Sequence, residues 1–147
     1  MWKTLVPVAI GILLLTAFAA PVSGASHEAA SQTGLEGVSF KADQTVYSLD
    51  ETVDLSLRNG SSDDVFFGTP YVIEVFKDGT WYPTSLTDDL MFTQQIITLP
   101  PGETYRTSVD LQLFGDRMSP GWYKIVKQVR ADEESKKVEA VFRVVEK

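Results

Sequence analysis

The sequence predicts an all-β protein, an antiparallel β-sandwich of seven or eight strands that follows an N-terminal signal segment. Three observations favour this fold. Apolar side chains recur at every second position after residue 36, and turn residues interrupt this alternation at a spacing of roughly 8–12 residues. No window beyond the N-terminal segment has a helical period. The folded domain is therefore assigned to residues 37–147.

The first half of the domain alternates clearly and contains one strong turn signal. Val53, Leu55 and Leu57 are separated by polar residues, as in a half-buried strand. Asp78-Gly79 favours a hairpin because both residues tolerate positive φ. Strands are expected at residues 38–42, 52–58, 71–77 and 80–83, with a short edge segment at residues 65–67.

The second half continues the same pattern. Pro100–Glu103 and Gly115–Gly121 are turns or connections, and Ala131–Ser135 is a charged turn. An irregular strand is expected at residues 91–99, and further strands are expected at residues 105–113, 122–130 and 136–145.

The N-terminus is typical of a secretory signal peptide, assigned to residues 1–25. Lys3 precedes an apolar run from Leu5 to Ala20, and the small residues Ser23-Gly24-Ala25 follow. The protein is therefore expected to be secreted or to lie on the extracellular face of the cell envelope. Cleavage near Ala25 is favoured; the alternative is an uncleaved signal, which would be its one attachment to a membrane. Residues 26–36 are small and polar and are interpreted as a flexible linker.

Composition excludes several classes of partner and cofactor. The net charge is −7, from 13 Lys and Arg against 20 Asp and Glu, without a basic stripe, so nucleic acid is not an expected partner. The chain has no cysteine, which excludes disulfides and a lipid-modified cysteine. Its single histidine, His27, precedes the domain, so zinc ligands are lacking. No metal and no cofactor are expected.

The same inventory argues against catalysis. Nucleophilic systems need a histidine or cysteine inside the fold, and phosphate-binding glycine motifs are lacking. Only carboxylate pairs remain, at Asp63-Asp64, Asp88-Asp89 and Glu133-Glu134. These pairs fall in turns, where solvated carboxylates are poorly oriented for acid–base chemistry. The sequence predicts a protein that is not an enzyme and has no catalytic residues.

Aromatic residues in or beside the predicted loops are the candidate binding residues. Trp and Tyr provide large contact areas at a small cost in conformational entropy. The alternative is that these rings cap the core. The candidates are Phe66, Phe67, Trp81, Tyr82 and Phe92.

Four segments together resemble the immunoglobulin-like domain of uncharacterised exported proteins of Bacillus and related Firmicutes. They are YSLDETVDLSLRNGSSDDVFFG (47–68), YVIEVFKDGTWY (71–82), LPPGET (99–104) and MSPGWYKIVKQV (118–129). The resemblance implies an immunoglobulin-like sandwich without an assigned catalytic site. A non-enzymatic exported module that binds a protein, a peptide or cell-wall material is the expected function. Tyr123, at the start of a strand, is similar to the tyrosine corner of such sandwiches.

A second resemblance supplies the alternative function. Met91–Gln95 and Leu99–Thr104 are similar to a stretch of the Bacillus intracellular proteinase inhibitor family, which is also a β-sandwich. The tryptophan-rich W-x-W loop of that family is missing here. The alternative is therefore a protease inhibitor in which residues 86–95 face the protease.

Overall fold

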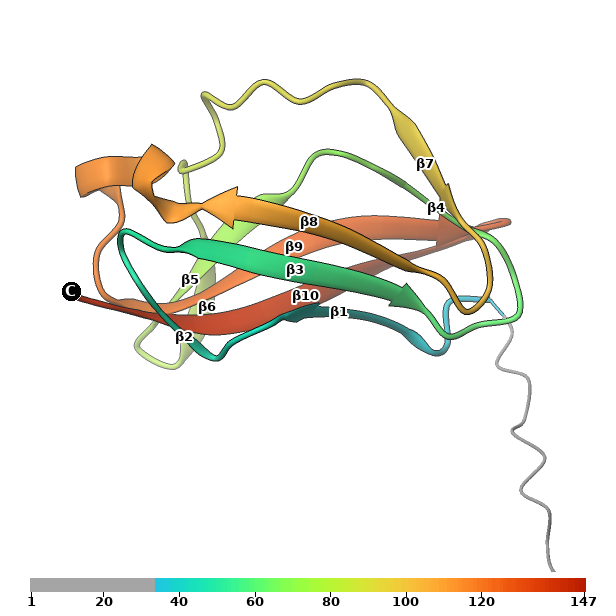
Figure 1. Ribbon diagram of the computed structural model, residues 1–147, viewed down its shortest axis with the longest axis horizontal. Coiled ribbons are helices and arrows are strands. Elements are labelled where there is room, and N and C mark those ends of the chain that lie inside the picture. Colours follow the sequence, from blue (N-terminus) through green and yellow to red (C-terminus); the bar gives the residue numbers. More distant parts are fainter. Residues whose placement is uncertain (1–33) are drawn as a thin grey trace, which may run out of the picture.

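Two β-sheets pack face to face around one apolar core in the computed structural model, which describes residues 34–147 (Figure 1). The smaller sheet has three strands in the order β1–β3–β8, and both pairs are antiparallel. Alternation in β3 buries Val53, Leu55 and Leu57 and leaves the residues between them on the outer face. The bounds are Val38–Ala42 for β1, Thr52–Asn59 for β3 and Thr104–Asp110 for β8.

The larger sheet is organised by two long strands, β9 (Gly121–Ala131) and β10 (Glu134–Val145), which form an antiparallel hairpin. β10 also pairs in parallel with β2, and β9 pairs antiparallel with β4 and β5. The hairpin partner of β5 is β6, and β7 pairs with β4. The remaining bounds are Val46–Ser48 for β2, Val65–Gly68 for β4, Val72–Lys77 for β5, Thr80–Pro83 for β6 and Ile96–Leu99 for β7.

One edge of β9 is shared by two strands that follow each other in the sequence. Phe67 of β4 lies opposite Val129, whereas Ile73 of β5 lies opposite Ile125. The chain leaves the sheet between them, at residues 69–71, so the ladder along this edge of β9 is interrupted. Backbone carbonyls at such a break need partners other than a neighbouring strand.

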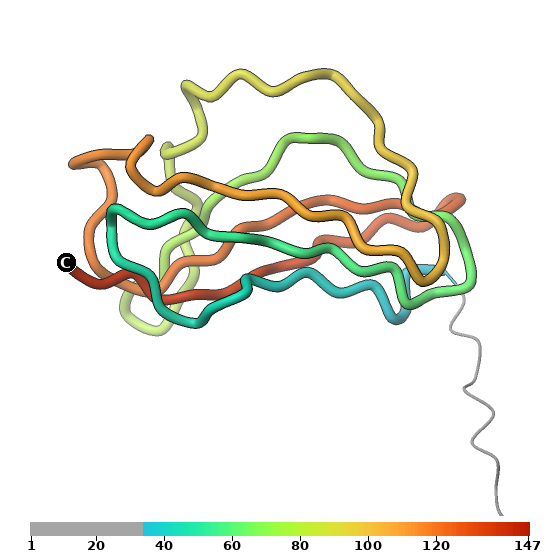
Figure 2. The backbone as a smooth tube through the Cα atoms, viewed as in Figure 1, coloured from blue at the N-terminus to red at the C-terminus, as the bar shows by residue number. Residues whose placement is uncertain are grey.

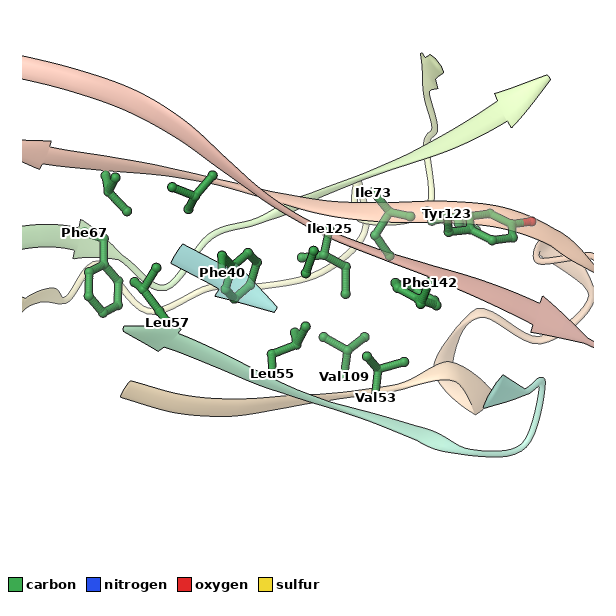
Figure 3. Packing of buried hydrophobic residues seen from close by; sticks show 14 of the residues in the cluster. Phe40, Val53, Leu55, Leu57, Phe67, Ile73, Val109, Tyr123, Ile125 and Phe142 are labelled. Carbon is green, nitrogen blue, oxygen red and sulfur yellow. The ribbon is translucent and has the colours of Figure 1, made fainter. Parts of the chain in front are cut away.

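Side chains from both sheets fill the core between them (Figure 3). Leu55 and Val109 project from the smaller sheet toward Ile125 and Phe142 of the larger one. At one end, the Tyr123 hydroxyl donates a hydrogen bond to the Ser119 carbonyl at 2.7 Å. This bond runs from a residue near the start of β9 back to the connection before the strand, and it is the tyrosine corner that the sequence predicts.

The predicted fold class is confirmed, and most differences are local. Residues 34–147 contain ten strands instead of seven or eight, partly because β2 has three residues and no alternation of its own. The strand expected at residues 91–99 is confined to β7. The Asp78-Gly79 hairpin turn is as predicted, with φ of 51° and 81°.

A short helix replaces the end of one predicted strand. The strand expected at residues 105–113 ends at Asp110, and the 3-10 helix η1, Leu111–Arg117, follows. The Asp110 side chain accepts a hydrogen bond from the Gln112 N–H at 2.9 Å and caps this helix. Its buried side chains, Leu111 and Phe114, are three residues apart, which is the repeat of a 3-10 helix.

The start of the domain is also corrected. The predicted signal peptide, residues 1–25, and most of the predicted linker, residues 26–36, lie outside the described residues. Leu35 falls within that linker range, yet it is 1% exposed and belongs to the core. The Gly34 N–H donates to the Asp63 carboxylate at 2.8 Å. The packed domain therefore begins no later than residue 34.

Candidate functional site

Three aromatic side chains gather at one end of the outer face of the larger sheet. Trp81 of β6 lies opposite Phe76 of β5, and their ring centroids are 5.1 Å apart. Trp122 lies one position beyond the last paired residues of β9 and β5, which are Tyr123 and Val75. Because side chains alternate between the faces of a sheet, Phe76 and Trp122 occupy neighbouring positions on its outer side.

Valines on three further strand positions extend this surface. Val72 of β5, Val141 of β10 and Val46 of β2 are exposed, as is Trp122, which is 44% exposed. Val141 lies opposite Lys124, so it belongs to the same outer side as the aromatic rings. We call this surface the outer apolar face; its members are Val46, Val72, Phe76, Trp81, Trp122 and Val141.

An ion-paired lysine lies at the centre of the outer apolar face. The ammonium of Lys124 is 3.0 Å from a Glu74 carboxylate oxygen and 2.7 Å from a Glu139 carboxylate oxygen, and it lies 4.9 Å from the centroid of the Trp81 ring. Burial lowers the pKa of Lys124, but hydrogen bonds to Glu139 and Glu74 outweigh that effect and raise it above the usual value. The charges in the middle of this face therefore already have partners.

A valine on the outer side of β9 is buried by its neighbours. Val126 lies between Val72 of β5 and Glu139 of β10 in the register, and it is only 4% exposed. It does not belong to the core cluster between the sheets. The outer apolar face is thus packed tightly enough to exclude water from a side chain that lies outside the sandwich.

The five candidate binding residues do not form one site, and three of them lie at separate places on the surface. Trp81 lies on the outer apolar face. Tyr82 is 48% exposed, but it pairs with Val75 and lies on the side of β6 opposite to Trp81. Phe66 is half-buried and lines a shallow hollow of about 210 Å³ near Ile96, at the other end of the larger sheet.

The other two candidates are packed inside or against the sandwich. Phe67 is a correction: it is buried, and its ring lies 5.0 Å from that of Tyr105 because β4 directs it between the sheets. Phe92 is half-buried with its ring 5.1 Å from that of Tyr71. The sequence interpretation also missed Phe76 and Trp122, whose positions read as ordinary strand residues.

The segment between β6 and β7 arches over one side of the sandwich (Figure 2). Its first part is held by buried Leu86, and the Thr93 carbonyl accepts a hydrogen bond from the Thr69 hydroxyl at 2.6 Å. Between these points Met91 is 98% exposed, beside half-buried Phe92. The segment therefore presents one apolar side chain to solvent between two attachment points.

The described residues offer neither a metal centre nor a membrane span. Within residues 34–147, no three His, Cys, Asp or Glu side chains are grouped to hold a metal ion. No helix in that range is long and apolar enough to cross a bilayer.

The fold and this face together define an immunoglobulin-like β-sandwich with an apolar outer surface. Residues 34–143 match the bacterial Ig-like domain family. The chain belongs to that family, whose members are generally non-catalytic and often occur in surface or exported proteins. No curated protein matches the chain.

Solved structures with a related arrangement are distant. The periplasmic chaperone SfaE aligns over 74% of this chain and 57% of its own length, with 11% identity and a TM-score of 0.46. The DNA glycosylase AlkC of Pseudomonas fluorescens covers 74% of this chain and 30% of its own, at 17% identity and a TM-score of 0.38. A family 123 glycoside hydrolase of Clostridium perfringens covers 76% and 27%, at 12% identity and a TM-score of 0.35. This chain therefore spans less than two thirds of each.

Proposed function

We propose that this protein is a non-enzymatic, exported binding module whose outer apolar face docks on another protein. The observation that carries the proposal is the exposure of two aromatic side chains, Phe76 and Trp122, together with three valines on one side of the larger sheet. Contiguous exposed apolar surface is uncommon on a monomer and marks interaction sites. Tryptophan is also among the residues that dominate binding energy at interfaces.

The chemistry of the face favours a protein or peptide over a cell-wall glycan. Sugar recognition needs hydrogen-bonding groups beside the aromatic rings, because a glycan presents hydroxyls. Here the central polar groups, Lys124, Glu74 and Glu139, are paired with each other. The exposed valines match apolar side chains of a partner and offer nothing to hydroxyls.

Export is the second part of the proposal. It is supported by the sequence of residues 1–25, which has the organisation of a signal peptide, and by the family, whose domains often occur in surface or exported proteins. A partner outside the cytoplasm follows from it.

Site-specific photo-crosslinking tests the docking surface. A photoreactive phenylalanine analogue replaces Val141 on the outer apolar face or Ser56 on the outer side of the smaller sheet. We expect a protein adduct from envelope or medium fractions with the probe at Val141 and none with the probe at Ser56. Trp122→Ala should abolish that adduct, and Arg106→Ala, on the smaller sheet, should not.

The outcomes that contradict the proposal are distinct. Equal adducts from the two probe positions would show unspecific contact. A sugar ligand would be identified instead if the protein binds isolated wall glycan, if treating that glycan with protease beforehand does not reduce the binding, and if Trp122→Ala abolishes it. Circular dichroism of each variant shows that a lost adduct does not reflect unfolding.

Protease inhibition is the second candidate, because of the geometry around Met91. This residue is almost fully exposed on a segment attached to the sandwich on either side. An inhibitory loop needs such an exposed side chain on a restrained backbone. The purified protein should then inhibit a subtilisin-like protease, and Met91→Asp should weaken that inhibition strongly. Absence of inhibition at micromolar protein, or cleavage of the segment as a substrate, would end this proposal.

A further inference from the structure

The interior of the sandwich contains a lysine at the break between β4 and β5. Lys127 lies between Ile125 and Val129 in β9 on the inward side, and it is 4% exposed. Its ammonium donates hydrogen bonds to the carbonyls of Gly68, Thr69 and Pro70 at 2.9, 3.2 and 3.0 Å. An ammonium has three N–H groups, so these three carbonyls satisfy all of them.

This interior charge has no counter-ion among the described residues. Lys124, three positions earlier in β9, pairs with two carboxylates, whereas Lys127 takes part in none of the ion pairs within residues 34–147. Its other neighbour is the ring of Phe67, whose centroid is 5.5 Å from the ammonium. Burial lowers the pKa of Lys127 from 10.5 to about 8, because the charged form is disfavoured away from water when no opposite charge is nearby.

A cavity of about 200 Å³ lies beside this lysine, between the sheets. Its walls are aromatic and aliphatic, and Thr107 and the two tyrosines add hydroxyl groups. In the part of the chain that the structure describes, the hydroxyls of Tyr71 and Tyr105 make no hydrogen bond to protein. Burial raises the pKa of Tyr71, so its hydroxyl remains a proton donor. The lining residues are Phe40, Leu55, Thr69, Tyr71, Phe92, Tyr105, Thr107, Ile125 and Lys127.

We propose that this cavity binds a small monocarboxylate with an aromatic or branched apolar body. The size fits, because an apolar cavity of about 150 Å³ is enough for benzene. The charge fits, because Lys127 has no carboxylate partner; its three N–H groups stay on the backbone carbonyls, and the attraction to a ligand carboxylate in the cavity is Coulombic and is strengthened away from water. The hydroxyls of Tyr71, Tyr105 and Thr107 supply donors to the carboxylate, while Phe92 and Phe40 contact its apolar body.

This site is separate from the outer apolar face, since Lys127 and Ile125 face the interior and Lys124 and Trp122 face outward. The proposal therefore does not depend on the protein partner proposed above.

Nuclear magnetic resonance titration of the purified protein with benzoate and with benzyl alcohol tests the site. The two probes share a ring and differ in charge. We expect benzoate to bind about tenfold more tightly than benzyl alcohol, and to shift signals of Ile125, Leu55 and Phe92. Benzoate should also raise the pKa of Lys127, whose titratable neighbours in the cavity are Tyr71 and Tyr105, and benzyl alcohol should not.

Two variants of the cavity and one of the outer face decide the interpretation. Lys127→Met should remove the preference for benzoate; if that variant does not fold, the double variant Tyr71→Phe and Tyr105→Phe, which keeps both rings, should weaken benzoate binding several-fold. Trp122→Ala should leave benzoate binding unchanged. Tighter binding of N-acetylphenylalanine than of phenylacetate would identify a peptide carboxyl terminus as the source of the carboxylate. Equal binding of benzoate and benzyl alcohol, or shifts confined to the outer face, would overturn the proposal.

Discussion

The outer sides of the two sheets differ in chemistry, although both sheets supply alternating strands to the same core. On the smaller sheet every outward position of β3 and β8 is polar, as in the cross-strand pairs Ser56 and Arg106, and Asp54 and Ser108. On the larger sheet the outward positions include Phe76, Trp122 and other apolar residues. One side has the composition of a solvated surface and the other that of a surface that meets a partner.

Strand β9 shows this difference most clearly, because its two sides are inverted at adjacent residues. Lys127 carries a charge into the interior, and Val126 carries an apolar side chain to the outside, yet both are buried. Local departures from the expected pattern of polar and apolar residues occur mostly at functional sites. Both proposed sites, the outer apolar face and the cavity, lie along this strand.

The largest expected effect comes from placing the same charge on the two outer sides. Val126→Asp puts a carboxylate in a buried position opposite Glu139, and should lower the free energy of unfolding by about 3 kcal/mol. Ser56→Asp lies opposite Lys41 and Arg106 and should change it by less than about 0.5 kcal/mol. Urea unfolding measures both. Val126→Ala separates loss of packing from burial of charge, and similar values for the two aspartates would remove the distinction between the faces.

The second effect tests the interior charge through pH. Below about pH 8 Lys127 is protonated in the folded and the unfolded chain, so it does not make the free energy of unfolding depend on pH. Between pH 8 and 10.5 the unfolded chain binds more protons, so the free energy of unfolding should rise with pH, by about 2 kcal/mol before other groups titrate.

A tyrosine limits that rise at higher pH. Burial and a hydrogen bond to Asp43 raise the pKa of Tyr47 from 10.0 to about 12. Above about pH 10.5 Lys127 has lost its proton in both states, while the folded chain keeps the Tyr47 proton that the unfolded chain has lost, so stability should fall. Urea titrations across this range should show a maximum in the wild type, and Lys127→Met should lack the ascending part. An unchanged ascending part in Lys127→Met would contradict the assignment.

The smallest effect concerns the ion-paired centre of the outer apolar face. Lys124→Met removes two ion pairs and the contact with the Trp81 ring, and should lower the free energy of unfolding by about 1 kcal/mol. Lys77→Met, at an exposed position of the β5–β6 hairpin that contains Trp81, is the matched control and should have almost no effect. A double-mutant cycle with Trp81→Leu should give a coupling energy of about 0.5 kcal/mol between the two side chains. If the two changes in the free energy of unfolding are simply additive, the Trp81 ring does not stabilise the Lys124 ammonium.

Much of the fold is predictable from the sequence because a period of two persists through the domain. The Asp78-Gly79 turn and the tyrosine corner at Tyr123 are local signals with one structural meaning each, and both are found. β2 was missed because its place depends on a parallel partner almost a hundred residues later, at Arg143–Val145. The 3-10 helix was missed because Leu111 and Leu113 continue the alternation of the preceding strand.

The candidate site was only partly predictable, because sequence alone does not say which side of a central strand faces outward. In β9, Trp122, Lys124 and Val126 lie on one side and Tyr123, Ile125 and Lys127 on the other. Each set contains apolar residues and one lysine, so the two sides are equivalent until the register with β5 and β10 is known. Trp81 and Phe67 were both selected because they lie beside predicted turns; Trp81 lies on the outer face, whereas Phe67 is buried between the sheets.

The pairing of β2 with β10 has a mechanical consequence. The described chain enters the sandwich at one end and leaves it at the other (Figure 1), and β2 runs parallel to the last residues of β10. A force that pulls these two ends apart therefore acts along the two strands in opposite directions. All of the hydrogen bonds between them share that load at once instead of opening one by one. A domain pulled between an N-terminal tether and a C-terminal attachment would resist extension at this short strand first.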